Sequence, residues 1–284
     1  MQLVTLSAAK GLSRGEEESL VPIDFHAPEN RHSYATRQAD SSWKTAISDM
    51  VDIKGKRVLD IGCGEGIYTK ALADMGAASV TGVDSSKTML EGAIENCNGY
   101  ANIDFVTGNA LSTGLLAERY DLILERALIH HLAPGDLRTC FVEAFRLLQP
   151  GGMLIVQDRT PEDCLLPGSK THIRGYFFSH YPRLIGHEIA RRPRSDMVLQ
   201  TLQLVGFRRT SERKLWETRT IYPNLDSLVA DLLARSSQSI PYELTDNELQ
   251  DFVTYITYIE EHAQSDDGAE IVEQDCWTIW SAVK

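Results

Sequence analysis

A glycine-rich segment, residues 62–66, separates an apolar run at 57–61 from a helical pattern of apolar residues. Glycine lets the backbone turn tightly and lets a ligand approach it closely. A helix that starts after such a turn offers unpaired N–H groups to an anionic group. Asp60 is the last polar residue of the apolar run, so we expect its carboxylate to point into the turn. The combination favours a nucleotide-like ligand over a turn without one.

Two further predicted strands end in polar residues that suit the same ligand. The run 79–83 ends in Asp84, at about the spacing where an acidic residue reaches ribose hydroxyls. The run 103–106 is followed closely by Asn109. The dinucleotide fingerprint needs a third glycine where Ile67 stands, which disfavours a nicotinamide dehydrogenase.

In this order, the motifs resemble those of the class I S-adenosylmethionine (SAM)-dependent methyltransferases. Residues 60–66 are similar to the family motif that cradles the methionine end of SAM, and Asp84 to the acid on the ribose. Asn109 stands where the family usually has Asp, beside the adenine. Residues 120–132 resemble its fourth strand and the helix after it, and 147–156 resemble the turn into its fifth. The resemblance covers about residues 30–160.

The resemblance implies SAM as the cofactor and a set of residues that bind it. A helix at 30–53 is expected to close over SAM, with Tyr34 reaching the sulfonium; the alternative is that Tyr34 packs the helix down. We take the following residues as cofactor-binding: Tyr34, Arg37, Asp60, Gly62, Cys63, Gly64, Asp84, Ser85, Met89, Asn109, Ala110, Glu125 and Arg126. No residues are assigned to a metal.

His130 and His131 follow the fourth predicted strand and are the candidate catalytic residues. Methyl transfer from a sulfonium needs mainly proximity, orientation and a dry site. Some acceptors also need a base to take a proton, and histidine is suited to that task. In the family, the second histidine mostly lines the cofactor pocket, so the alternative is a structural role.

The candidate cofactor-binding and catalytic residues lie close together only if strands and helices alternate along the chain. The pattern of apolar residues predicts this alternation. We expect an α/β fold with a doubly wound, mostly parallel seven-stranded sheet, Rossmann-like, with a helical cap inserted near the C-terminus. The resemblance implies that the last strand is antiparallel and lies between the fifth and the sixth. Predicted strands are 57–61, 79–83, 103–106, 121–125, 153–157, 212–221 and 276–283; predicted helices in the sheet domain are 66–75, 86–96, 113–117, 135–148 and 196–205.

The chain divides into three predicted parts. Residues 1–29 form a flexible N-terminal segment, 30–221 with 271–284 form the SAM-binding domain, and 222–270 form the helical cap. Residues 159–195 are rich in helix breakers, aromatic residues and histidine, and we interpret them as a lid over the acceptor, the alternative being a packed connector. Within this segment, residues 170–194 form a basic stretch. Its Arg174 and Arg183 suggest an anionic or polar aromatic acceptor.

Net charge and cysteine content limit the classes of partner and the compartment that we expect for this protein. The net charge of −12 argues against a nucleic-acid backbone and an anionic membrane surface as partners. Five widely spaced cysteines favour free thiols in a reducing compartment, and we predict a cytoplasmic protein that has no signal peptide or membrane span. We expect a small-molecule methyl acceptor. The alternatives are a nucleic-acid methyltransferase and a SAM-binding protein without turnover; the accepting atom and the oligomeric state stay open.

Overall fold

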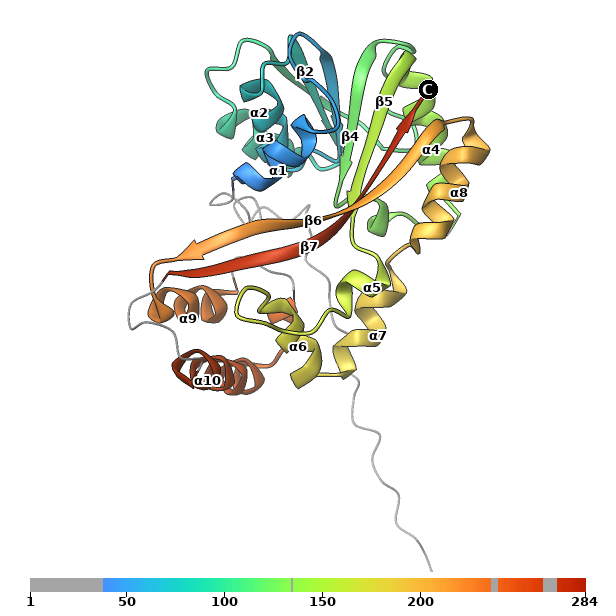
Figure 1. Ribbon diagram of the computed structural model, residues 1–284. Coiled ribbons are helices and arrows are strands. Elements are labelled where there is room, and N and C mark those ends of the chain that lie inside the picture. Colours follow the sequence, from blue (N-terminus) through green and yellow to red (C-terminus); the bar gives the residue numbers. More distant parts are fainter. Residues whose placement is uncertain (1–37, 134, 236–239, 263–269) are drawn as a thin grey trace, which may run out of the picture.

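The computed structural model describes residues 38–133, 135–235, 240–262 and 270–284. Its centre is one seven-stranded sheet in the order β3-β2-β1-β4-β5-β7-β6, in which only β7 runs antiparallel to its neighbours (Figure 1). This confirms the predicted sheet and the place of its last strand. The strands are β1 (Arg57–Ile61), β2 (Ser79–Asp84), β3 (Ile103–Thr107), β4 (Tyr120–Arg126), β5 (Leu148–Asp158), β6 (Arg208–Tyr222) and β7 (Ile271–Val283).

Helices cover both faces of the sheet because alternate strand residues face opposite sides. On one face, Val58 packs with α1 (Ser41–Ser48) and α2 (Ile67–Asp74). On the other, Leu59 packs with α4 (Leu137–Leu147) and α8 (Ser195–Val205). The remaining helices are α3 (Lys87–Asn96), α5 (Pro161–Cys164), α6 (Arg174–His180), α7 (Arg183–Ala190), α9 (Leu225–Ala234) and α10 (Asp246–His262).

A second apolar core lies outside the sheet, in a helical unit made by α6, α7, α9 and α10. Phe177 of α6 stacks on Phe252 of α10, with ring centroids 3.8 Å apart. The pairing of β7 with β5 ends at Asp158 and Thr278, but its pairing with β6 continues to Tyr222 and Ile271. The two strands therefore leave the sheet as a long ribbon, and α6, α9 and α10 lie along it (Figure 1).

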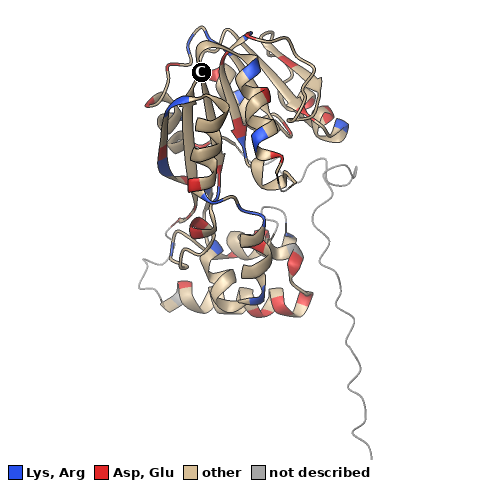
Figure 2. Ribbon diagram, turned by 90° about the vertical axis from the view of Figure 1, so that its right-hand side faces the viewer, with Lys and Arg blue, Asp and Glu red and all other residues tan. Residues whose placement is uncertain are grey.

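Charges of both signs are spread over the helices of the sheet domain, whereas α10 in the helical unit carries no Lys or Arg (Figure 2). Within the described ranges, no helix is long and apolar enough to cross a bilayer.

One predicted helix is absent, and two predicted strands are shorter than the strands observed. The helix predicted at 113–117 is absent: Gly114 has φ 76°, and Thr113 is bound to Glu143 through its backbone N–H and its hydroxyl, which fixes a turn. Both ribbon strands extend further than the sequence predicted. Tyr34 and Arg37 lie outside the described residues, and the described part of the predicted helix at 30–53 is helical only over α1.

We expect Trp43→Ala to lower the free energy of unfolding by roughly 3–5 kcal/mol. Trp43 is fully buried between α1 and the sheet, and its indole N–H donates to Gln157 Oε1 at 2.8 Å. The change therefore removes both packing and a buried hydrogen bond. Urea unfolding followed by circular dichroism measures the loss. Trp216→Ala, at a tryptophan 42% exposed, is the control and should cost much less.

Candidate functional site

In the glycine turn after β1, the backbone borders open space at one of the three glycines. Gly62, Gly64 and Gly66 all have positive φ, between 51° and 76°. A Cβ at Gly62 would lie 2.9 Å from the Leu128 side chain, and one at Gly66 would press on Cys97 and its neighbours. A Cβ at Gly64 would meet nothing within 4 Å. Gly62 and Gly66 are therefore needed for packing, whereas Gly64 leaves room for a ligand against the backbone.

The turn and Asp84 form one unit. The Asp84 carboxylate accepts the backbone N–H of Gly64 at 2.9 Å and that of Ser86 at 2.8 Å. The helix α2 begins directly after Gly66 without a side-chain cap. Unpaired N–H groups at a helix start favour an anionic ligand group. The carboxyl ends of β1 and β2 thus bring together a carboxylate, an open glycine backbone and a helix N-terminus without a side-chain cap.

Asp60 supports this turn from beneath. Its side chain is 2% exposed and accepts the hydroxyl of Thr69, in the first turn of α2, at 2.6 Å. Burial raises the pKa of Asp60 to about 6, against the lowering effect of the Thr69 hydrogen bond. Cys63 is also buried, and burial raises the pKa of its thiol well above the usual value. Cys63 therefore stays protonated and is unsuited to act as a nucleophile.

Four further predicted residues lie at the ends of β2 and β3. Ser85 is exposed directly after Asp84, and Met89 is buried in α3. Asn109 is exposed, and its Oδ1 accepts the backbone N–H of Leu111 at 2.8 Å. Ala110 packs against the core beneath it. The side-chain NH₂ group of Asn109 and the second lone pair of its Oδ1 are left to bind a ligand.

The two residues at the end of β4 are bound to other protein groups. Glu125 is fully buried, its Oε1 accepts the thiol of Cys140 at 3.5 Å, and burial raises its pKa to about 7. Arg126 pairs with Glu217 of β6 at 2.8 Å, and its guanidinium carbon lies 3.9 Å from the ring centroid of Tyr68. Both side chains therefore contact protein groups near the turn.

Sequence reasoning missed a second buried arginine at the same edge. Arg159 follows β5 directly, pairs with Asp275 of β7 at 2.7 Å and lies 3.8 Å from the ring centroid of Trp277. Burial lowers the pKa of Arg159 to about 10, although Asp275 opposes the shift. The available signal was its place at a strand end, like that of Arg126.

Of the two candidate catalytic histidines, His130 is held by a carboxylate. Its Nδ1 lies 2.8 Å from Oδ2 of Asp158, the last residue of β5. Asp158 also pairs with Arg192 at 2.7 Å. The ring of His131 packs on that of His130, with centroids 4.0 Å apart, but His131 is exposed. Sequence reasoning did not single out Asp158, although it ends its strand as Asp84 does.

In the basic stretch, the arginines that suggested an anionic acceptor are paired with carboxylates. Arg174 is buried against Glu188 at 2.7 Å, and Arg183 pairs with Glu248 of α10 at 2.8 Å. Glu188 also accepts Arg191 and Arg192. Neighbouring carboxylates therefore offset part of the charge excess on which that hypothesis depended, and the arginines join the helices to one another.

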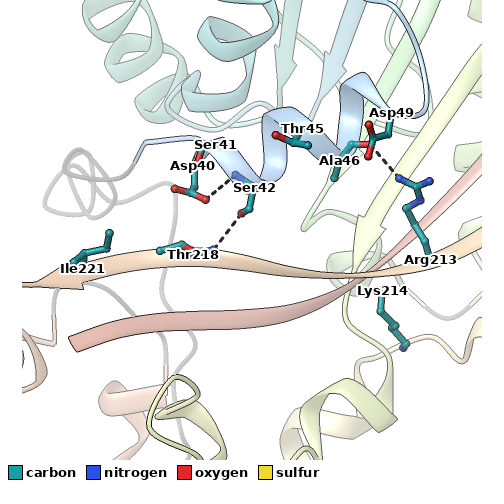
Figure 3. Close-up of a pocket in the computed structure, with 10 residues that line it drawn as sticks. All are labelled: Asp40, Ser41, Ser42, Thr45, Ala46, Asp49, Arg213, Lys214, Thr218 and Ile221. Atoms are coloured by element: carbon teal, nitrogen blue, oxygen red, sulfur yellow. Dashed lines mark hydrogen bonds between the residues drawn. The ribbon is translucent and has the colours of Figure 1, made fainter. Parts of the chain in front are cut away.

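A groove of about 600 Å³ lies elsewhere, between α1 and β6 (Figure 3). None of the predicted site residues lines it. The backbone N–H of Thr218 donates to the Ser42 hydroxyl across the groove, and Arg213 donates to the carbonyl of Ala46. In the part of the chain that the structure describes, no three His, Cys, Asp or Glu side chains are placed to hold a metal ion.

Comparisons with known proteins converge on one family. Residues 58–152 match the family model of a methyltransferase domain. A ubiquinone biosynthesis O-methyltransferase of Chelativorans sp. (strain BNC1) is 36% identical over 36% of this chain and 40% of that protein. A demethylmenaquinone methyltransferase of Tropheryma whipplei (strain Twist) is 29% identical over 62% of this chain and 77% of that protein.

The fold is shared with solved methyltransferases. Phosphoethanolamine N-methyltransferase 2 of Haemonchus contortus, in complex with SAM, superposes with a TM-score of 0.58 at 16% identity. The superposition covers 92% of this chain and 60% of that chain. Like the match to the Chelativorans protein, it spans less than two thirds of the relative.

We expect Gly64→Val to abolish SAM binding while the protein stays folded, because its side chain would fill the open space beside the turn. Gly55→Val is the matched control, since Gly55 also has positive φ and nothing within 4 Å of an added Cβ, but lies before β1. Both variants bear the strain of a side chain at positive φ, about 1–2 kcal/mol. Calorimetric titration with SAM separates them. Normal binding by Gly64→Val would place the cradle elsewhere.

Proposed function

We propose that this chain, which belongs to the class I SAM-dependent methyltransferases, transfers the methyl group of SAM to a small-molecule acceptor and leaves S-adenosylhomocysteine. The observation that carries the proposal is that Gly64, Asp84 and the N-terminus of α2 lie together. SAM, when bound, supplies a methyl group on a sulfonium that is already activated for displacement.

The residues present fit that cofactor. Gly64 leaves the space that a ligand needs against the backbone, and the half-buried Asp84 carboxylate lies beside it at the end of β2. A carboxylate at this place suits two vicinal ribose hydroxyls, which are hydrogen-bond donors. Ser85 and Asn109, which follow neighbouring strands, and Met89 of α3 complete the proposed cofactor set. Glu125 and Arg126 stay predictions, because their contacts are to protein groups.

A small molecule is the acceptor class that the relatives favour. By their names they are methyltransferases of ubiquinone biosynthesis, of demethylmenaquinone and of phosphoethanolamine. The net charge of −12 supports an acceptor other than nucleic acid or a membrane surface. Five free cysteines, all buried, support a reducing compartment, and we propose the cytoplasm.

We propose His130, rather than His131, as the general base for acceptors that must lose a proton. The reason is that Asp158 fixes the ring of His130, whereas His131 is exposed and packs on its neighbour. A base needs a fixed ring to meet the acceptor in a productive geometry.

We expect Asp84→Ala to weaken SAM binding at least tenfold, because hydrogen bonds to a charged group contribute roughly 1.5–3 kcal/mol. The change also removes the acceptor for the Gly64 N–H and so loosens the turn. Asp104→Ala, at an exposed aspartate on the adjacent β3, is the control and should bind normally. Calorimetry gives both affinities.

Turnover is tested with the wild-type protein, SAM and a panel of phenol, carboxylate, amine and thiol acceptors, by measuring S-adenosylhomocysteine. Formation that depends on one acceptor and is lost in Asp84→Ala supports the proposal. SAM binding without product for any acceptor, or product only with nucleic acid, favours one of the two alternatives instead.

A further inference from the structure

A continuous chain of buried hydrogen bonds links His130 to the helical unit. His130 Nδ1 contacts Asp158 Oδ2 at 2.8 Å, and Asp158 Oδ1 accepts Arg192 Nη1 at 2.7 Å. Arg192 Nη2 then donates to Glu188 Oε1 at 2.6 Å, and Arg174 donates to the same oxygen at 2.7 Å. Asp158 ends β5, whereas Glu188 lies on α7 and Arg174 on α6. The chain therefore runs from the sheet into the two helices.

The bonds at Asp158 determine which nitrogen of His130 carries the proton. Asp158 is fully buried and also accepts the backbone N–H groups of His130 and Arg159. With His130 and Arg192 beside it, its pKa lies well below the usual range, so it is ionised and has no proton to donate. The contact with Nδ1 can form only if Nδ1 is the donor. A neutral His130 then has its lone pair on Nε2.

The Nε2 atom of His130 has no hydrogen-bond partner within the described part of the chain, and the side chain is 8% exposed. Burial lowers the pKa of the ring, Asp158 raises it, and Arg192 and Arg191 lower it. The histidine is therefore neutral near pH 7, with its lone pair on Nε2.

We propose that Asp158 and Arg192 are positioning residues that hold His130 as a neutral base with Nε2 presented to the methyl acceptor. The inference rests on the proposed methyl transfer. It adds that the helical unit takes part, since Arg192 is held by Glu188 of α7. His130 is ready for catalysis only when this unit is docked on the sheet.

The arrangement selects a class of acceptor, one whose attacking atom bears an acidic proton, such as a phenolic or enolic hydroxyl. The acceptor's proton passes to Nε2. The electron pair that it leaves forms the new bond to the methyl carbon, and the pair of the old carbon–sulfur bond stays with sulfur. The imidazolium is stabilised by Asp158 until its proton is released to water.

The histidine can be observed directly by NMR, without an acceptor. Protein labelled with ¹⁵N-histidine and saturated with S-adenosylhomocysteine gives ring-nitrogen signals, and His130→Gln identifies those of His130. We expect a protonated Nδ1 and a bare Nε2 at pH 7, with a titration midpoint below the ordinary 6.5. A protonated Nε2 at pH 7 in the wild-type protein would overturn the proposal, whether or not any variant folds.

Two variants test the positioning. Asp158→Asn should abolish the preference for a protonated Nδ1, because a neutral amide can donate as well as accept. Arg192→Gln should raise the titration midpoint of His130 by about one unit, since a positive charge nearby is lost. Arg183→Gln is the matched control: Arg183 also lies on α7, but it pairs with Glu248 and should leave His130 unchanged. An unchanged midpoint in folded Arg192→Gln contradicts the role of Arg192.

The same samples separate this inference from the proposed function. If SAM binds by calorimetry but His130 has the other tautomer, only the positioning fails. If SAM does not bind, the proposed methyl transfer fails whatever the histidine does.

Discussion

The buried carboxylate of Asp158 is the interaction on which both halves of the molecule depend. An ionised carboxylate out of water is tolerated only when it is paired and hydrogen-bonded. Asp158 meets that need with His130 from the chain after β4 and with Arg192 from the chain just after α7. The sheet domain and the helical unit are therefore joined at the point where β5 ends, beside the candidate site.

The glycine turn imposes a second constraint, because a backbone that must approach a ligand has no side chain to hold it. Here neighbouring elements hold it instead. The carbonyl of Val83 accepts the N–H groups of Gly62 and Cys63, and Asp84 accepts that of Gly64. The turn is thus fixed by β2, which also supplies the adjacent carboxylate, so the geometry of the candidate site depends on the sheet register.

The ribbon of β6 and β7 shows how buried charges are paired between the sheet domain and the helical unit. Glu217 and Asp275 are cross-strand neighbours, and each pairs with an arginine from the carboxyl edge of the sheet, Arg126 and Arg159 respectively. Such pairs add little net stability, because desolvation offsets their attraction, but they penalise misplacement of either partner. They suit a region where the helical unit must lie in one position relative to the carboxyl edge of the sheet.

The sequence alone determined where most strands lie, the glycine turn and two of the acids at the strand ends, because apolar periodicity and local turn chemistry fix these features, whereas the place of the last strand came from the family resemblance. It could not determine the partners of buried charges. The early part of β7 was missed because charged Glu273 and Asp275 conceal a buried strand, and the basic stretch suggested an acceptor site because Glu248 lies far along the chain from Arg183. Only the tertiary structure decides which charges meet, since pairing depends on distance in space rather than spacing in sequence.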